Sequence, residues 1–315
     1  MQRDPVTVEK FFTLHHAHLG LKLVAGAGGL GRRIQEPTVN RPGLLLAGFT
    51  KYFASRRIQV FGSAESSFMK TLPPAQREAR YAELFSYRIP CLVLCRGINA
   101  DKLLLRTAEE ANVPVLKCPN ITMNFINDAT LALEGMFAPR STELGSMVDI
   151  LGIGVIIRGE SGIGKSECVL ALIERGYSLV SDDVTRVVLE DGEDVVGSSP
   201  ELTASHMEVR GIGIINVQQM FGVKSIRTKK KVDLVVSLKQ WDEVKDVDRL
   251  GLEQQCIKIL GRDIPHMVIP VSPGRDVARL VEVAAFYTKM KMFGLNPAQE
   301  LNETLIARMN PGTKL

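Results

Sequence analysis

Apolar residues in the first 130 positions fall into two kinds of run, which alternate along the chain. The longer runs have the spacing of amphipathic helices and lie at 6–19, 75–85, 101–111 and 125–136. The shorter, almost wholly apolar runs are typical of buried strands and lie at 58–61, 90–94 and 113–116. Because strands separated by helices of this length favour a parallel sheet, the pattern predicts an N-terminal α/β domain over residues 1–130.

The pattern changes after the last of these helices, and we predict a second domain over residues 131–315. An apolar run at 154–157 predicts a buried strand, and 167–175 predicts the helix that follows it. A weaker apolar run at 179–183 ends in two acids. Much later in the chain, Asp276 is suited to cap the amphipathic helix that begins directly after it. The predicted fold class is therefore α/β, with two domains that are each long enough to bury a core.

Composition narrows the possible partners. The 315 residues include 39 Lys and Arg against 35 Asp and Glu, giving a net charge of +4, and 45 % are hydrophobic. These values exclude a disordered or low-complexity chain. The basic run at 227–231 lacks the neighbouring aromatic residues that stack on bases, so we expect no nucleic-acid partner. A solvated loop is the expected structure of this run, and contact with an acidic partner or a phosphate is the alternative.

Cysteine usage and hydropathy indicate the compartment. Five cysteines are too few, and odd in number, for the disulfide framework of a secreted domain. Cys91 and Cys95 lie in an apolar run, so we expect buried thiols there rather than metal ligands. The apolar run 150–157 is far short of the ~20 residues that a membrane-spanning helix needs, and the N-terminus has no run typical of a signal peptide. The sequence predicts a reduced, soluble, cytoplasmic protein with no membrane partner.

The strongest local signal is the octapeptide GESGIGKS, which matches G-x-x-x-x-G-K-[ST] at every fixed position. Glycines let backbone N–H groups surround phosphate oxygens, and the helix that follows directs its positive end at the anion. The predicted nucleotide-binding residues are Gly159, Glu160, Ser161, Gly162, Ile163, Gly164, Lys165 and Ser166. Lys165 is expected to reach the outer phosphates, and Ser166 to offer its hydroxyl to Mg²⁺.

Two adjacent acids, Asp182 and Asp183, stand where a P-loop NTPase strand would end. The Asn/Thr-Lys-x-Asp motif of GTPases is absent from the sequence, so the ordinary NTPase pattern is incomplete. Successive residues at the end of a strand point in opposite directions. One carboxylate can therefore face the phosphates and accept a proton from an incoming hydroxyl, while neighbours hold the other. A solvated turn with two acids is the alternative.

The stretch EVRGIGIIN combines an acid, a base, two glycines and an apolar tail. Glu208 is a candidate metal ligand and Arg210 a candidate phosphate clamp, while Gly211 permits a close backbone approach. Taken alone, the stretch is equally consistent with a β-turn. Arg275 is a further candidate anion ligand, because Asp276 places it near the start of a helix.

These motifs together resemble the bifunctional HPr kinase/phosphorylase family. The resemblance is carried by GESGIGKS, SDD, EVRGIGIIN, DRLGL and PGRDVARLVEVAA, and in the N-terminal part by NRPGLLLAGFTKYFASRRIQVFG. It implies a catalytic domain with a P-loop core similar to that of phosphoenolpyruvate carboxykinase. It also implies a hexameric bacterial enzyme that phosphorylates a serine of the phosphocarrier protein HPr with ATP or pyrophosphate. Such enzymes remove the same phosphate with inorganic phosphate, release pyrophosphate, and regulate carbon metabolism and sugar uptake.

The resemblance also implies roles for particular residues. The implied catalytic residues are Lys165, Asp182, Asp183 and Arg249. Asp182 matches the proton acceptor, which becomes a proton donor in the reverse reaction. The implied ligands for Mg²⁺ are Ser166 and Glu208. The segment 270–275 matches a stretch tied to dephosphorylation, which adds to the case for Arg275.

One position departs from the family pattern. Leu144-Gly145 stands where the family usually has His-Gly, whose histidine is counted among the active-site residues. Leucine neither carries a proton nor binds phosphate, and strand alternation is expected to point the neighbouring Glu143 elsewhere. We therefore expect ATP-dependent phosphorylation to persist with Asp182 as base, and the phosphorylase direction to be weakened. A nucleotide-binding regulator without turnover and a carboxykinase-like metabolite kinase stay open as alternatives.

Overall fold

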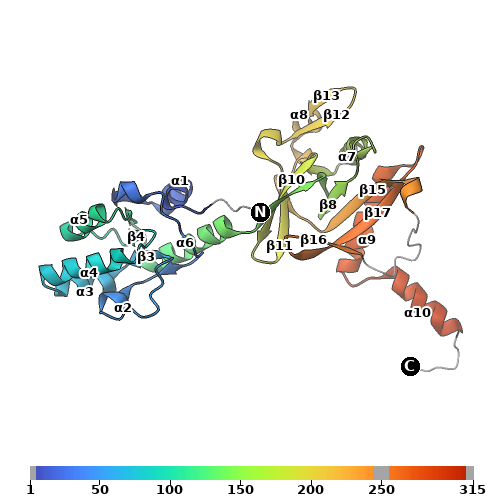
Figure 1. The fold of residues 1–315 in the computed structure, drawn as a ribbon. Coiled ribbons are helices and arrows are strands. Elements are labelled where there is room, and N and C mark those ends of the chain that lie inside the picture. The colour runs from blue at the N-terminus through green and yellow to red at the C-terminus, as the bar shows by residue number, and fades with distance from the viewer. Residues whose placement is uncertain (1–4, 245–254, 310–315) are drawn as a thin grey trace. The chain divides into compact units, whose positions relative to one another are not determined.

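The structure is a computed structural model, and it describes residues 5–244 and 255–309. The chain divides into two compact units, Met1–Phe137 and Ala138–Leu315, which we describe separately (Figure 1). Among the helices of the described ranges, none is both long and apolar enough to cross a membrane.

The first unit is built on a sheet with the strand order β1-β5-β4-β3-β2. Its strands are β1 (Lys22–Ala25), β2 (Val39–Asn40), β3 (Ile58–Phe61), β4 (Leu92–Leu94) and β5 (Val115–Lys117). Its helices are α1 (Val8–Leu19), α2 (Gly43–Leu46), α3 (Ser63–Thr71), α4 (Pro74–Ser86), α5 (Lys102–Glu110) and α6 (Thr122–Phe137), with a short 3₁₀ turn η1 (Ala27–Gly29). Strands β2 to β5 pair in parallel and β1 pairs antiparallel with β5, so the predicted parallel α/β layer is confirmed.

Helices cover both faces of this sheet. Val60 and Val93 belong to a buried cluster that includes residues of α1 and α6. Phe61 and Leu94 belong to a second cluster, which includes residues of α4 and α5. Burial on both faces explains why these strands are continuous apolar runs rather than alternating ones.

The cysteines of the chain are mostly buried. Cys91 and Cys95 are buried, as predicted, and so are Cys118 and Cys168, whereas Cys256 is exposed. Burial raises the pKa of the Cys91 and Cys168 thiols to about 12. These two thiols are therefore unreactive at neutral pH.

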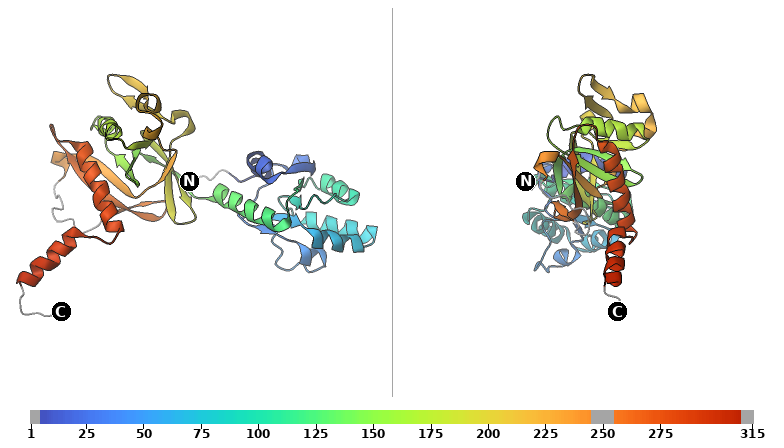
Figure 2. Two further views of the ribbon diagram at one scale, coloured as in Figure 1. Left: turned by 180° about the vertical axis from the view of Figure 1, so that it is seen from behind. Right: turned by 90° about the vertical axis from the view of Figure 1, so that its right-hand side faces the viewer.

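The second unit holds two sheets and a separate hairpin. The larger sheet has the order β16-β17-β15-β8-β7-β9, the smaller has the order β14-β11-β10-β6, and β12 pairs with β13. The strands are β6 (Arg140–Leu144), β7 (Ser146–Ile150), β8 (Ile153–Arg158), β9 (Ser178–Ser181), β10 (Val184–Glu190), β11 (Asp194–Ser198), β12 (His206–Val209), β13 (Gly213–Asn216), β14 (Lys229–Lys231), β15 (Leu234–Gln240), β16 (Cys256–Ile259) and β17 (Arg262–Val271). The helices are α7 (Lys165–Glu174), α8 (Val217–Phe221), α9 (Val277–Met292) and α10 (Pro297–Met309), with 3₁₀ turns η2 (Glu201–Thr203), η3 (Val223–Ser225) and η4 (Trp241–Glu243). Figure 2 shows α10 projecting away from these sheets.

The larger sheet positions the candidate site. Its strands β8, β15 and β17 run parallel. One face packs on α7 and α9 in a cluster that contains Val155 and Val281. The other face packs on the smaller sheet in a cluster that contains Ile156 and Val187. The carboxyl ends of the parallel strands therefore meet at one edge of the sheet, where open α/β sheets bind their ligands.

The basic run 227–231 corrects a prediction. Lys229–Lys231 forms β14 at the edge of the smaller sheet, and is not a loop. Lys229 pairs with Glu190 at 3.1 Å, and Lys231 pairs with Asp194 at 2.6 Å. Lysines suit an edge strand because their charge discourages pairing with another strand, which explains the run without a polyanionic partner.

Candidate active site

The phosphate loop connects β8 to α7, the strand and helix predicted around it. Gly162 and Gly164 have φ of 88° and 98°, a left-handed conformation that favours glycine. The Nζ of Lys165, the first residue of α7, donates a hydrogen bond to the Gly159 carbonyl oxygen at 3.2 Å. The loop thus places a lysine and backbone N–H groups at the start of a helix, which is an arrangement that binds phosphate.

The remaining loop residues differ in exposure. Glu160 and Ser161 are exposed, Ser166 is half-buried in the first turn of α7, and Ile163 is buried in the core below. A Cβ at Gly159 would lie 2.9 Å from the Ile163 side chain and 3.1 Å from a carbonyl oxygen of β15. Glycine is therefore required at Gly159 by packing.

The two acids form the turn between β9 and β10 rather than the end of a strand. β9 ends at Ser181, and Asp183 has a φ of 53°. Strand alternation therefore does not set the directions of these side chains, which corrects the prediction. Both oxygens of Asp182 accept hydrogen bonds, so being held by neighbours does not distinguish a supporting acid from a proton acceptor here: Oδ1 accepts one from Ser146 Oγ at 2.8 Å, and Oδ2 accepts one from the backbone N–H of Glu208 at 3.1 Å.

The surroundings of Asp182 act on its protonation in both directions. Burial raises the pKa of the carboxyl, and the neighbouring charge of Asp183 acts the same way. The hydrogen bonds from Ser146 and from the Glu208 N–H lower the pKa, and the net direction is upward. A raised pKa makes a carboxylate a better proton acceptor than a fully solvated one.

The hairpin β12–β13 joins the loop to the acids. The backbone N–H of Glu208 reaches Asp182, and Arg210 donates a hydrogen bond to Ser161 Oγ at 2.5 Å. Gly211, in the hairpin turn, has a φ of 83°. The stretch is therefore a β-turn that also contacts the site, so the two alternatives left open by the sequence are compatible.

Arg275 follows the carboxyl end of β17, at the same edge of the larger sheet as the phosphate loop. Arg275 donates a hydrogen bond to the Pro270 carbonyl oxygen at 3.2 Å, and its guanidinium lies 5.4 Å from the ring centroid of Trp241. It precedes α9, which Asp276 caps as predicted. Arg249 lies outside the described residues.

The position that departs from the family pattern lies beside the acid turn. Leu144 ends β6 opposite Val184, and its side chain is 75 % exposed. Glu143 forms an ion pair with Arg158 at the end of β8. The expectation that strand alternation turns Glu143 away from Leu144 is confirmed, so Glu143 offers no substitute for the family histidine.

Sequence reasoning missed the polar residues that hold the acid turn. Thr185 Oγ1 donates a hydrogen bond to the Gly145 carbonyl oxygen at 2.9 Å, and lies 2.6 Å from Ser181 Oγ. The Gly145 N–H donates to the Asp183 carbonyl oxygen at 2.8 Å, and Ser146 is fully buried. In the sequence these are isolated small polar residues in apolar strands. Only the pairing of β7 with β9 and of β6 with β10 gives them significance.

The oxygen donors near the loop fit Mg²⁺. Ser166 offers a hydroxyl, and Glu208 offers a carboxylate on an exposed part of the hairpin. In the described part of the chain, no cluster of three or more His, Cys, Asp or Glu side chains is arranged to hold a metal. Mg²⁺ needs only one or two protein ligands where substrate phosphates and water complete its coordination.

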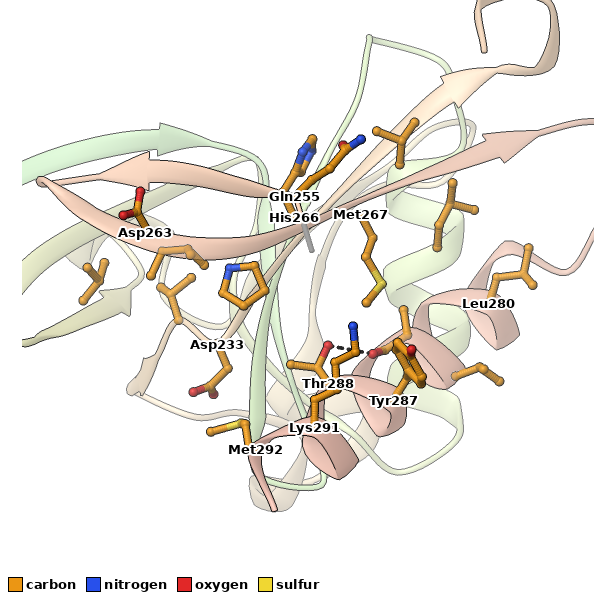
Figure 3. Close-up of a pocket in the computed structure, with 18 of the residues that line it drawn as sticks. Asp233, Gln255, Asp263, His266, Met267, Leu280, Tyr287, Thr288, Lys291 and Met292 are labelled. Carbon is orange, nitrogen blue, oxygen red and sulfur yellow. Dashed lines mark hydrogen bonds between the residues drawn. The ribbon is translucent and has the colours of Figure 1, made fainter. Parts of the chain in front are cut away.

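A cavity of about 1120 Å³ lies elsewhere in the second unit, along β17 and α9. Figure 3 shows Met267 pointing from β17 toward Tyr287 and Thr288 of α9, with His266 and Gln255 on the other side of the strand. Its lining includes the candidate residue Arg275, but no residue of the phosphate loop or of the acid turn. The chemistry of the loop, and not the size of a cavity, therefore locates the candidate site.

Comparison with known proteins decides the family. A model described as "HPr Serine kinase N terminus" matches residues 6–133, and one described as "HPr Serine kinase C-terminal domain" matches residues 135–305. The chain belongs to the HPr serine kinase family. The resemblance of its motifs to that family is therefore confirmed.

Two relatives of this family match almost the whole chain, and a solved structure matches about half of it. A protein of Geobacter sulfurreducens named HPr kinase/phosphorylase is 42 % identical over 92 % of this chain and 91 % of its own length. One of the same name from Geobacillus kaustophilus is 40 % identical over 93 % of this chain and 94 % of its own. The solved structure of the Hpr(Ser) kinase/phosphatase from Coxiella burnetii is 34 % identical, has a TM-score of 0.47, and covers 52 % of this chain and 99 % of its own.

Proposed function

We propose that this chain phosphorylates a serine hydroxyl of the phosphocarrier protein HPr with ATP, and also catalyses removal of that phosphate. One observation carries the proposal: a single hairpin contacts the phosphate loop through Arg210 and the half-buried Asp182 carboxylate through the Glu208 N–H. It brings a phosphate-binding element and a proton acceptor into one site. The names of relatives at 42 % and 40 % identity support both directions of the reaction.

In the forward direction, the serine oxygen attacks the γ-phosphorus of ATP, and the bond from that phosphorus to the β–γ bridging oxygen breaks. ADP leaves, and the serine proton passes to the Asp182 carboxylate. Lys165 binds the outer phosphates from the start of α7, and Arg210 clamps them from the hairpin. Asp183 supports its neighbour by holding the turn in place, because its carbonyl oxygen accepts a hydrogen bond from the Gly145 N–H.

Ser166 and Glu208 are the proposed protein ligands of Mg²⁺. When bound, the ion neutralises charge on the phosphates. The family resemblance further supports Arg249 as a catalytic arginine and Arg275 as a residue of the dephosphorylation step. It also supports a homohexamer, a cytoplasmic location, a role in carbon metabolism, and a core over residues 131–315 similar to that of phosphoenolpyruvate carboxykinase.

In the reverse direction, an oxygen of inorganic phosphate attacks the phosphoserine phosphorus, the bond from that phosphorus to the serine oxygen breaks, and pyrophosphate is released. The serine oxygen recovers a proton from Asp182. Pyrophosphate can replace ATP in the forward direction, since it carries the same bond between phosphates. We propose that this reverse direction is weakened here, because exposed Leu144 offers no group that binds phosphate.

The experiment that tests this function uses labelled ATP, Mg²⁺ and three samples: HPr, a panel of small acids, and no acceptor. We expect label on HPr alone, and a roughly 100-fold or greater loss of rate in Asp182→Asn. Asp194→Asn is the matched control, because Asp194 pairs with Lys231 on another part of the unit. Label on a small acid would instead indicate a metabolite kinase, and ATP binding without transfer would indicate a regulator without turnover.

The reverse direction needs its own assay. Phospho-HPr and inorganic phosphate are incubated with the chain, and pyrophosphate is measured. We expect slow release relative to the forward rate. Robust release of pyrophosphate would contradict the proposal that Leu144 weakens this direction.

A further inference from the structure

Ser146 makes two hydrogen bonds to the acid turn from inside the sheet. It is fully buried at the start of β7. Its Oγ donates to Asp182 Oδ1 at 2.8 Å and accepts from the backbone N–H of Asp183 at 3.2 Å. A serine hydroxyl has one proton and two lone pairs, so a single side chain satisfies both contacts at once.

Backbone hydrogen bonds fix the path of the same turn. The Gly145 N–H donates to the Asp183 carbonyl oxygen at 2.8 Å, and the Val184 N–H donates to the Asp182 carbonyl oxygen at 2.5 Å. Neither of these bonds touches the Asp182 carboxylate. Its two oxygens are held by the Ser146 hydroxyl and by the Glu208 N–H. Within the described residues, Ser146 is therefore the one side chain among the groups that direct the carboxylate, which also accepts backbone N–H bonds from Glu208 and Asp183. The course of the backbone is held by these two carbonyl bonds as well as by the bond from the Asp183 N–H to Ser146.

We propose that Ser146 is a positioning residue for phosphoryl transfer, whose hydroxyl aims the Asp182 carboxylate at the acceptor serine. This inference rests on the proposed function. Leu144, two residues earlier, is exposed and offers no hydrogen bond to the acid, while Ser146 supplies one from the buried side of the turn. A hydroxyl bonded to a charged group contributes enough that its loss should reduce the rate about 10- to 100-fold.

Three substitutions at Ser146 separate the hydroxyl from the volume it fills. Ser146→Ala removes the hydroxyl, whereas Ser146→Thr keeps it. Ser146→Val has the shape of threonine and lacks the hydroxyl, so the Thr/Val pair remains informative even where Ala disturbs folding. Ser225→Ala is the matched control, because Ser225 is also a buried serine of this unit, and its hydroxyl bonds only backbone carbonyls in the described structure.

The assay is phosphorylation of HPr by the full chain, with kcat and the KM for ATP measured for each variant and folding followed by thermal unfolding. We expect kcat to fall about 10- to 100-fold in Ser146→Ala and Ser146→Val, and to stay within about threefold in Ser146→Thr. The KM for ATP should change less than twofold, because Ser146 does not touch the phosphate loop. In an Asp182→Asn background, Ser146→Ala should have no further effect on kcat.

Two results would overturn the inference. One is a Ser146→Val rate within twofold of that of Ser146→Thr, with both chains folded. The other is a fall in kcat from Ser146→Ala that is equally large in the wild-type chain and in the Asp182→Asn background. A wild-type chain that transfers no phosphate to HPr overturns the proposed function as well. An active wild type with unaffected Ser146 variants overturns only the positioning role.

Discussion

Gly145 lies where the chain passes from β6 to β7, and replacing it with alanine tests how tightly the acid turn is held. Its φ is 146°, which is unfavourable for a residue with a side chain. An added Cβ would lie 2.7 Å from the Ile157 carbonyl oxygen and 3.1 Å from the Ile156 side chain. Because β8 is paired with β7 on one side and β15 on the other, this carbonyl has little freedom to move.

The stability lost in Gly145→Ala has two sources, the backbone conformation and the crowding of the added Cβ. The unfavourable backbone conformation costs about 1–3 kcal/mol, and overpacking against fixed atoms costs about 1–3 kcal/mol more. We expect the free energy of unfolding of the second unit to fall by about 3 kcal/mol. At about 2–4 °C per kcal/mol for a unit of this size, the Tm should fall by about 6–12 °C.

Trp241 provides the assay, because it is the one tryptophan of the sequence and it belongs to the second unit. Its fluorescence follows the thermal unfolding of that unit. Gly152→Ala is the matched control: its φ is 92°, it lies between β7 and β8, and nothing lies within 4 Å of its added Cβ. The control should lose the backbone cost alone, so its Tm should lie about 2–12 °C above that of Gly145→Ala, the difference being the overpacking cost of about 1–3 kcal/mol.

The comparison of the two glycines decides whether the steric argument is correct. A Tm for Gly145→Ala equal to that of Gly152→Ala would show that β8 yields to the methyl group. The close approach of Gly145 to Ile157 would then not hold the acid turn in place.

Three further outcomes are expected. Glu65 is buried and accepts hydrogen bonds from the Gly62 N–H and from Arg41. Glu65→Ala should therefore lower the free energy of unfolding of the first unit by about 2–3 kcal/mol, measured by denaturant titration. The control Glu110→Ala, at an exposed position, should lower it by less than about 0.5 kcal/mol. Burial acts to raise the pKa of Glu65, but these hydrogen bonds hold it below its ordinary 4.5. The resulting stability is present above pH 4.5 and lost as the pH falls below it, and hydrogen exchange of α3 at pH 3 and pH 6 measures the loss. Leu144→His should leave the forward rate within about twofold and raise pyrophosphate release about tenfold or more.

The longer helices and the central strands of the first unit could be predicted, because their structure is encoded locally, whereas β1, β2, α2 and α3 were missed. The run 75–85 became α4, and 58–61 became β3, since helix spacing and fully apolar strands are visible within one segment. The second unit was less predictable. β17 carries Pro265 and His266 among apolar residues and shows no clean period, because its burial depends on β15 and β16 beside it.

The candidate site also has one part that could be predicted from the sequence and one part that could not. The phosphate loop was predicted because all its ligating atoms come from one short segment, whose spacing is the signal. The contacts of Asp182 with Ser146 and with Glu208 join segments 36 and 26 residues away. Such contacts follow from strand pairing, and a buried serine looks in the sequence like any other small residue of an apolar strand. The roles of Arg249 and Arg275 stay predictions.

The two directions of the reaction make different demands on residue 144. In the proposed mechanism Asp182 carries the serine proton in both directions, so we expect that the absence of a histidine removes no required proton carrier. What an imidazole at this exposed place would add is positive charge toward phosphoserine and inorganic phosphate, and it carries that charge mainly below pH 6.5. The gain in pyrophosphate release from Leu144→His should therefore be larger at pH 6 than at pH 8, chiefly through a lower KM for phosphate. An equal gain at both pH values would show that the neutral ring acts by hydrogen bonding instead.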